Sequence, residues 1–312
     1  MERSFILRLY EMGERNFAGA DLRGADLSGA TLIEVNLAGA NLTGANLSRA
    51  FLTKSNLSGA FLNWANVSFV KMSEGNLTDA DLTKADLSGA FLVKSNLSRA
   101  KLSAANLSSV NLRGANLERA NLCGANLEAI NLRGANLKGA NLSWAKLCGA
   151  RLSGAILYGA FLNNVNLTGA FLNGVDLNGV DLNGVNLRDA KLSGTNLQGA
   201  NLTAANFSEA QLKGASTIGS DLTGADLRQA SLCQAKLNWS NLSKADLTKA
   251  DLREANLLGA KIDRAEFTQA AMSERTHRYL CKIATGITPW THRETKATLS
   301  SISIHSKQEI FS

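Results

Sequence analysis

A repeat of five residues runs without insertion or deletion from Arg15 to Glu274 and limits what this chain can fold into more than any other feature. Of the 52 positions between residues 17 and 272 whose numbers end in 2 or 7, 44 are leucine. The other eight are Phe17, Val67, Met72, Phe207, Thr217, Ile262, Phe267 and Met272. Each repeat reads small residue, Asn or Asp, leucine, polar residue and then glycine or another residue, as in Ala25-Asp26-Leu27-Ser28-Gly29.

A period of five is incompatible with an α-helix. Because a helix rotates by roughly 100° per residue, leucines five residues apart would spiral around its axis and share no face. In an extended chain alternate side chains share a face, so the small first residue and the leucine point one way and the Asn or Asp points the other. The fourth and fifth positions, rich in Ser, Thr and Gly, then turn the chain. Each repeat is therefore expected to form one side of a polygon.

A single turn of such a chain leaves its leucines exposed, whereas stacked turns cover them, as in other solenoids. If each buried leucine contributes about 1.5–3 kcal/mol, the leucine columns dominate stability and fill the interior, which leaves no room for a ligand. The asparagines at position two are expected to hydrogen-bond the local turn backbone and their neighbours in the turns above and below.

The repeat resembles the A(D/N)LXX motif of the pentapeptide-repeat family over more than four-fifths of the chain. The segment from Leu7 to Phe17 is also similar to the amino-terminal part of many cyanobacterial members. The resemblance implies an all-β solenoid, namely a right-handed quadrilateral parallel β-helix with four repeats to a coil of 20 residues and about thirteen coils for the 52 repeats. The right hand agrees with the general preference of parallel crossovers.

Short helical caps are expected at both ends, because an uncovered coil exposes apolar side chains and unpaired strand edges. Residues 1–14 form the predicted N-terminal cap, residues 15–274 the β-helix, residues 275–290 the C-terminal cap and residues 291–312 a mobile tail. In the N-terminal cap Gly13 is the predicted stop. The apolar residues predicted to share one helical face are Phe5, Ile6, Leu9 and Met12.

The C-terminal cap is predicted from helical spacing, followed by Gly286 and Pro289 as stop signals. The residues with this spacing are Thr276, Tyr279, Leu280 and Ile283. In the tail, the alternation of Ile302 and Ile304 favours a short strand.

The weakest repeat runs from Ala215 to Gly219, because Thr217 occupies the leucine position. Two alternatives are open: a one-residue bulge that turns Ile218 inward, or a buried Thr217 whose hydroxyl is satisfied.

Composition favours one elongated cytoplasmic domain. Net charge is +7, with −1 in residues 1–14, +4 in residues 15–274 and +4 in residues 275–312. The four cysteines do not pair by spacing, which favours a reducing compartment. No apolar stretch approaches the roughly 20 residues that a membrane span needs.

The residue types that enzymes and metal sites commonly use are missing from the repeat, which contains no histidine. His277, His292 and His305 lie beyond it at spacings unlike those of zinc sites. Pairs of position-two aspartates, such as Asp21 and Asp26, follow from the repeat itself. We therefore expect no enzyme activity, no cofactor, no metal and no small-molecule substrate.

The outer surface carries more information, because four repeats per coil place residues 20 apart in one column. On the face that includes Leu52 and Leu92, basic residues recur, and only Glu34 and Glu74 oppose them before residue 215. Phenylalanines share this face at the position usually held by asparagine. The candidate partner-binding residues are Phe51, Lys54, Lys71, Phe91, Lys94, Arg113, Arg133, Arg151, Phe171 and Lys191. The opposite face presents Phe61, Trp64, Trp144 and Phe161.

Two functional hypotheses follow. The first is a non-enzymatic scaffold that binds another protein, with end-to-end self-association as a further option. The second is binding of nucleic acid or an anionic membrane surface through the basic and aromatic face. A solubilising face without a partner is the alternative to both. Some members of the family bind type II topoisomerases by imitating duplex DNA, and the net positive repeat of this chain departs from that pattern.

Overall fold

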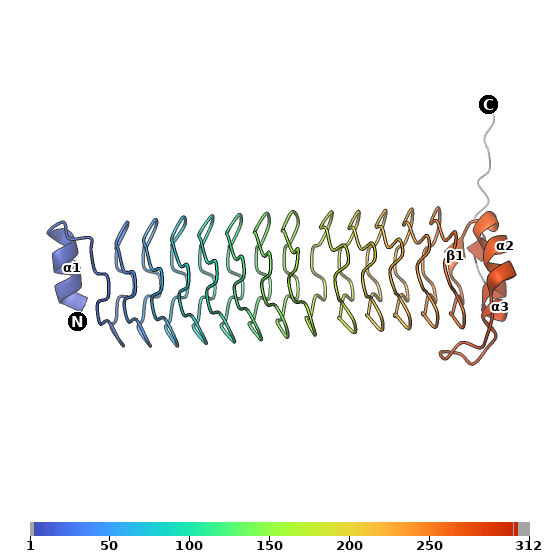
Figure 1. Cartoon of the computed structure of the whole chain (residues 1–312), viewed down its shortest axis with the longest axis horizontal. Helices are drawn as coiled ribbons and strands as arrows, with labels where there is room; N and C mark the ends of the chain where they lie inside the picture. Colours follow the sequence, from blue (N-terminus) through green and yellow to red (C-terminus); the bar gives the residue numbers. More distant parts are fainter. Residues whose placement is uncertain (1–2, 302, 305–312) are drawn as a thin grey trace, which may run out of the picture. The chain divides into compact units, whose positions relative to one another are not determined.

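A computed structural model describes residues 3–301 and 303–304. The chain divides into two compact parts, an N-terminal block of residues 1–166 and a C-terminal block of residues 167–312. Each block consists of stacked coils (Figure 1). The N-terminal block begins with helix α1. The elements outside the coils are α1 (Arg3–Glu11), β1 (Ala271–Met272), α2 (Glu274–Ile283), α3 (Thr295–Thr298), the 3-10 helix η1 (Leu299–Ser301) and β2 (Ser303–Ile304).

Parallel bridges between residues 20 apart set the register of the coils. In the N-terminal block one such column joins Asn36, Asn56 and Asn76. In the C-terminal block another joins Asn201, Asp221 and Asn241. Each of these bridges involves position two of a repeat, and within each block four bridges occur in every 20 residues, so each coil contains four repeats. Because each side of a coil pairs at only one residue, few extended strands form although the architecture is a β-solenoid.

The repeat Ala45–Arg49 shows why position two is Asn or Asp. The N–H of position one donates to the carbonyl of the preceding leucine at 2.9 Å. Those of positions two, three and five donate to carbonyls of adjacent coils at 2.9, 2.7 and 2.8 Å. The remaining N–H, on Ser48, donates to the side-chain Oδ1 of Asn46 at 3.1 Å. All five donors are thus paired, which a chain with a buried backbone requires.

The asparagines also bond to one another between coils, as the sequence predicts. Asn56 Nδ2 donates to Asn36 Oδ1 at 3.1 Å, and Asn76 Nδ2 donates to Asn56 Oδ1 at 3.0 Å. These amides therefore support both the turn and the stacking, and their role is structural.

Position five lies in the left-handed region throughout the coils. Every residue whose number ends in 4 or 9, from Gly19 to Gln269, has a positive φ. This conformation costs a residue with a Cβ atom roughly 1–2 kcal/mol, so glycine is common there. Four aromatic residues nevertheless hold it, with φ between 54° and 64°: Trp64, Phe69, Trp144 and Trp239.

The core is made of the inward residues at positions one and three. Every leucine at position three is at most 5% exposed. Thr217 is buried in the leucine register, and its N–H donates to the Lys236 carbonyl at 2.8 Å. Its hydroxyl donates to the same carbonyl at 3.4 Å. The buried-threonine alternative is therefore confirmed, and the bulge with an inward Ile218 is wrong.

Helix α1 ends as predicted but presents a different face. Gly13 has a φ of 96°, and its N–H donates to the Tyr10 carbonyl at 3.0 Å. Ile6 is buried, whereas Phe5 and Met12 are 49% and 75% exposed. The predicted shared face is wrong because the helix is rotated so that Ile6, rather than Phe5, points inward.

Helix α2 lies where helical spacing predicts a helix. Ser273 caps it by accepting the N–H of Thr276 at 3.1 Å, and Leu280 is buried. Residues 291–301 do not form the predicted mobile tail, because residues 295–301 fold into α3 and η1 and Glu294 forms a bridge with Ile287. There Thr298 is buried, and its hydroxyl oxygen accepts the N–H of Phe267 at 3.1 Å.

The predicted strand near Ile304 is present in part. Strand β2 pairs in parallel with β1, with Ile304 opposite Met272. Ile302 and residues 305–312 lie outside the described residues.

Leu117→Lys tests the filled core, because Leu117 is fully buried and the new ammonium would have no partner. We expect the free energy of unfolding to fall by roughly 3–5 kcal/mol. Chemical denaturation followed by circular dichroism measures this change. The neighbouring, partly exposed Glu118→Lys is the control and should change stability by less than about 1 kcal/mol. Equal stability of the two variants would contradict the fold.

Candidate binding surface

The candidate residues are divided between the two blocks. Phe51 to Arg151 belong to the N-terminal block, whereas Phe171 and Lys191 belong to the C-terminal block. In the N-terminal block, parallel bridges join Phe51 to Lys71 and Lys71 to Phe91, so these three residues lie on consecutive coils. The structure brings them together as predicted, and we treat the N-terminal block as the candidate surface.

Lys191 does not present an unpaired positive charge. Its Nζ lies 2.6 Å from Asp189 Oδ1, and its side chain is only 24% exposed. The expectation that Lys191 adds to a basic face is wrong, because a corner places position five of one repeat next to position two of the following repeat.

Five side chains surround a shallow pocket at one corner of the N-terminal block. They are Arg49, Phe51, Phe69, Lys71 and Phe91, with Gly29 at the edge. The three rings are 36%, 51% and 47% exposed in chain order. We call these five residues the aromatic corner.

Each cation of the aromatic corner lies over a ring. Lys71 Nζ is 4.6 Å from the centroid of Phe51, and Arg49 Cζ is 5.9 Å from the centroid of Phe69. Cation–π contacts at exposed sites are worth about 0.5–1 kcal/mol. These contacts therefore hold the side chains near the pocket while the positive charges stay accessible.

Phe69 packs against the backbone of the next coil at Gly89. A Cβ atom added to Gly89 would come within 2.5 Å of Phe69 Cε1, so the ring occupies the space that a side chain would need. Phe69 also holds a positive φ of 54°, which is unfavourable for a bulky residue.

The sequence-based candidates do not include Arg49 and Phe69, because all of those candidates lie within one face of the coil. Both residues stand at position five, just before the corner. The signal that identifies them is the left-handed geometry of position five, which places its side chain beside position two of the next repeat. An aromatic residue two places before another candidate, as Phe69 stands before Lys71, carries this signal in the sequence.

Six exposed cations continue from the corner along the same face, one on each of six consecutive coils. We call them the basic row: Lys54, Lys71, Lys94, Arg113, Arg133 and Arg151. Neighbouring coils are about 4.8 Å apart. In the part of the chain that the structure describes, no carboxylate forms an ion pair with any of the six.

Backbone donors on this face lack the partner that the repeat normally supplies. The N–H groups of Thr53, Ser73 and Val93 have no acceptor among the described residues. The reason is that Phe51, Lys71 and Phe91 replace asparagine. Farther along the same column, Asn111 and Asn131 accept the corresponding N–H groups at 3.2 and 3.3 Å.

Successive stretches of the chain from residue 16 to residue 274 match the sequence model for pentapeptide repeats. The chain belongs to the pentapeptide repeat family. This confirms the resemblance seen in the sequence. Structures of the family imply that the parallel coils form a right-handed quadrilateral β-helix.

Two solved structures of pentapeptide repeat proteins are similar to the chain. One is HetL of the cyanobacterium Nostoc sp. strain PCC 7120, a protein involved in heterocyst differentiation regulation. HetL is 31% identical to this chain, with a TM-score of 0.51. The match covers 86% of this chain and 97% of HetL. A protein of the Arabidopsis thaliana thylakoid lumen is 34% identical with a TM-score of 0.33, covering 41% of this chain and 90% of that protein. A comparison with curated proteins gave no match.

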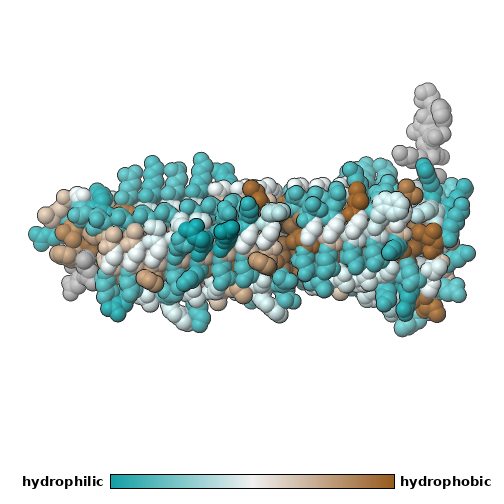
Figure 2. Space-filling model, in the orientation of Figure 1, coloured by the Kyte–Doolittle hydropathy of each residue, from teal (hydrophilic) through white to brown (hydrophobic). Residues whose placement is uncertain are grey.

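Exposed aromatic residues elsewhere on this pentapeptide repeat protein are more scattered. On the opposite face of the N-terminal block, Lys84 Nζ lies 4.4 Å from the ring of Trp64. Trp144 stands in the same column but four coils away, about 19 Å at the usual strand spacing. Figure 2 shows a mainly hydrophilic surface with separate hydrophobic patches. Of the surfaces described, the aromatic corner alone combines three rings and two cations around one pocket.

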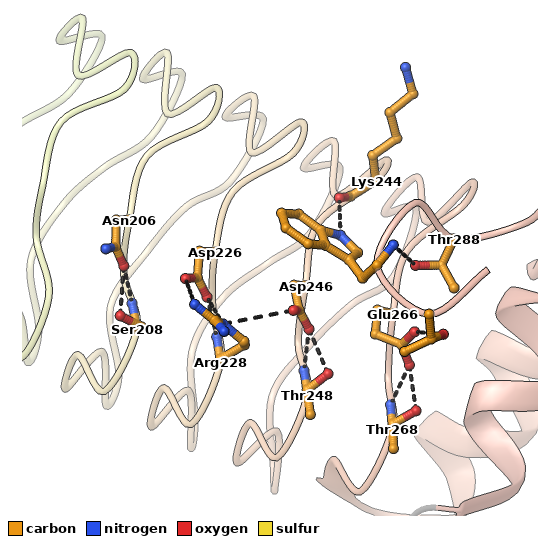
Figure 3. A network of polar contacts seen from close by, with 12 residues as sticks. Asn206, Ser208, Asp226, Arg228, Lys244, Asp246, Thr248, Glu266, Thr268 and Thr288 are labelled. Carbon is orange, nitrogen blue, oxygen red and sulfur yellow. Dashed lines mark hydrogen bonds and ion pairs between the residues drawn. The ribbon is translucent and has the colours of Figure 1, made fainter. Parts of the chain in front are cut away.

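A column of carboxylates in the C-terminal block has a structural role (Figure 3). Asp226, Asp246 and Glu266 lie on consecutive coils, and each accepts the N–H of the residue two places later at 3.1, 2.9 and 3.0 Å. The Thr291 hydroxyl covers this column by donating to Glu266. The indole N–H of Trp290 donates to the Lys244 carbonyl at 2.8 Å. The carboxylates therefore replace asparagine and do not form an open acidic site.

Asp246 is the carboxylate of this column with a perturbed pKa. It is 5% exposed, and burial raises the pKa of its carboxyl above the ordinary value, assisted by the neighbouring charge of Asp226. Hydrogen bonds from Thr248 and the Arg228 guanidinium, whose Nε lies 3.8 Å from Asp246 Oδ2, act in the opposite direction. Burial of the carboxylate is sufficient to explain this shift.

Neither a metal site nor a membrane-spanning helix is found in the described part of the chain. No group of His, Cys, Asp or Glu residues between residues 3 and 301 is arranged to hold a metal ion. Over the same residues, no helix has both the length and the apolar character needed to cross a bilayer.

Amide hydrogen exchange tests the unpaired donors. We expect the amides of Thr53, Ser73 and Val93 to exchange at least about tenfold faster than those of Ser58, Thr78 and Ser98, whose N–H groups are each bonded to an asparagine at 3.1 Å. Nuclear magnetic resonance measures both sets in one sample, because they alternate along the same coils. Phe91→Asn should slow exchange at Val93 alone. Equal exchange rates of the two sets would contradict the description of Thr53, Ser73 and Val93 as residues whose N–H groups lack an acceptor.

Proposed function

We propose that this chain is a non-enzymatic interaction module whose N-terminal block binds another protein through the aromatic corner and the basic row. The observation that carries the proposal is the replacement of asparagine by Phe51, Lys71 and Phe91 in one column. There the chain gives up a hydrogen bond that most of its other repeats keep, and it exposes rings and charges instead.

The filled interior supports a role for the outer surface. Because the leucine columns are buried and close-packed, binding chemistry is left to side chains at positions two, four and five. These positions repeat at the strand spacing, so a partner meets an ordered array of side chains on a rigid support. Rigid display of aromatic and basic residues is typical of protein-binding surfaces.

The cost of the aromatic corner also supports function. Arg49 and Phe69 hold a left-handed conformation that glycine holds at Gly29 and Gly89 in the same column. A repeat sequence selected for stability alone would keep glycine there and asparagine at residues 51, 71 and 91. Local departures of this kind are expected where a surface is used for binding.

The similarity to HetL, a protein involved in heterocyst differentiation regulation, fits an interaction role rather than a catalytic one. The basic row favours a second candidate, the binding of nucleic acid or an anionic membrane surface. The exposed rings favour the protein partner.

We also propose that α1 and residues 274–301 cap the ends of about thirteen coils made from the 52 repeats. The buried side chains of Ile6 and Leu280 support this arrangement, because each helix places one aliphatic residue out of solvent.

Capture of a partner tests the proposed function. Wild-type protein and a Phe51→Asn/Phe91→Asn variant are crosslinked in nuclease-treated lysate of the source organism, and captured proteins are quantified by mass spectrometry. We expect at least one protein to be captured by the wild type and reduced about tenfold or more by the variant, because two aromatic anchors are lost.

Phe61→Asn is the matched control, since Phe61 is an exposed position-two residue of the same block on another face. It should capture the same protein as the wild type. Capture that is equal with both variants, or no capture above a bait-free sample, would overturn the proposal.

A further inference from the structure

We propose that the aromatic corner binds an acidic peptide segment in which one large apolar side chain is flanked by Asp or Glu residues. This inference rests on the proposed function and adds the chemistry of the partner. Phe51, Phe69 and Phe91 hold the apolar side chain, and Arg49 and Lys71 bind the flanking carboxylates.

The lining of the pocket suits an apolar side chain. Its three rings come from three neighbouring coils and are between 36% and 51% exposed. A leucine or aromatic side chain placed among them removes apolar area on all three rings from water. Binding of a single apolar anchor in such a pocket is typical of hot spots in protein recognition.

The charges around the pocket are of one sign. Arg49 and Lys71 line it, and the rest of the basic row extends away from it along the face. From residue 51 to residue 155, Glu74 is the one carboxylate on this face against the six cations of the row. An acidic segment is therefore attracted and oriented, whereas a basic segment is repelled.

The backbone adds hydrogen-bond donors beside the same rings. The N–H groups of Thr53, Ser73 and Val93 have no acceptor in the described chain and stand one coil apart. In the next two coils of this column, the side-chain oxygens of Asn111 and Asn131 fill this place. A carboxylate or peptide carbonyl of the partner supplies the same type of acceptor, and charge-assisted bonds to backbone N–H groups are stronger than neutral ones.

A peptide fits these rings better than a nucleic acid does. Base stacking needs an open ring face. One face of Phe51 is covered by the Lys71 ammonium, and Phe69 lies between the Gly89 backbone and the Arg49 guanidinium. Ring edges and the pocket between them remain, and these suit an aliphatic or aromatic side chain.

Fluorescence anisotropy with the full-length protein tests the proposal. The probes are labelled twelve-residue peptides whose central residue is Leu, Ile, Phe or Trp between pairs of Asp and Glu. Comparison probes carry Ala at the centre, or Asn and Gln in place of the acids, and a labelled oligothymidylate represents nucleic acid. We expect at least one acidic anchor peptide to bind with a Kd below about 100 µM and at least tenfold more tightly than every comparison probe.

Matched variants assign the binding to the corner. Arg49→Glu/Lys71→Glu should weaken the peptide at least about tenfold. Arg119→Glu/Lys146→Glu is its control, because these exposed residues occupy the same two repeat positions elsewhere in the N-terminal block. This control should bind like the wild type.

Phe69→Gly separates binding from folding. Glycine suits the positive φ of residue 69, so the coil keeps its conformation while the pocket loses one wall. We expect at least about tenfold weaker peptide binding. Trp144→Gly is the control at the same repeat position and should bind normally.

The proposal is overturned if no acidic anchor peptide binds. It is also overturned if the Asn and Gln peptides or the oligothymidylate bind as tightly as the acidic anchor peptides, or if Arg49→Glu/Lys71→Glu binds the peptide as tightly as its control variant does. Should this happen while protein capture still depends on Phe51 and Phe91, the proposed interaction function stands with a partner of another chemistry. Loss of that capture dependence, by contrast, removes the proposed function itself.

Discussion

The hydrogen bond from the N–H of position four to the side-chain oxygen of position two is the interaction that stabilises most of the turns. In the repeat Ala45–Arg49 this bond joins the Ser48 N–H to Asn46 Oδ1 at 3.1 Å. The Ser48 N–H is the one backbone donor of the repeat that has no backbone carbonyl as its acceptor. The left-handed residue that follows completes the corner and returns the chain to the extended conformation. The residues at positions one and three face inward in register because this left-handed corner recurs in every repeat from Gly19 to Gln269.

The candidate surface lies in a column where three consecutive coils lack this bond. At Phe51, Lys71 and Phe91 the turn lacks its side-chain acceptor, and at Phe69 a bulky residue replaces glycine in the left-handed corner. The neighbouring coils keep the fold, so the local loss of stability is tolerated by the stack as a whole. The same departures expose rings, cations and backbone donors within a few ångströms of one another, which links the stability of the coil to its capacity for binding.

Much of the fold follows from the sequence, because a strict period of five fixes which residues face inward. The sequence leaves open whether Thr217 or Ile218 faces inward. A threonine hydroxyl can reach a backbone carbonyl only if the local register permits it, and the structure shows that it does. Residues 291–301 read as a polar tail because the burial of Thr295 and Thr298 depends on contacts with distant coils. For the binding surface, the sequence identifies Phe51, Lys71 and Phe91. It does not identify Arg49 and Phe69, whose proximity depends on the geometry of the corner.

The most direct test of the structure is its register, in which residues 20 apart are neighbours on adjacent coils. The side-chain oxygens of Thr78 and Ser98 lie 3.4 Å apart, so these residues suit an engineered cysteine pair. With the four native cysteines replaced by serine, mild oxidation followed by mass spectrometry would detect the crosslink. The structure predicts a disulfide in Thr78→Cys/Ser98→Cys and none in Thr78→Cys/Ser88→Cys. A disulfide in the second pair without one in the first would contradict it.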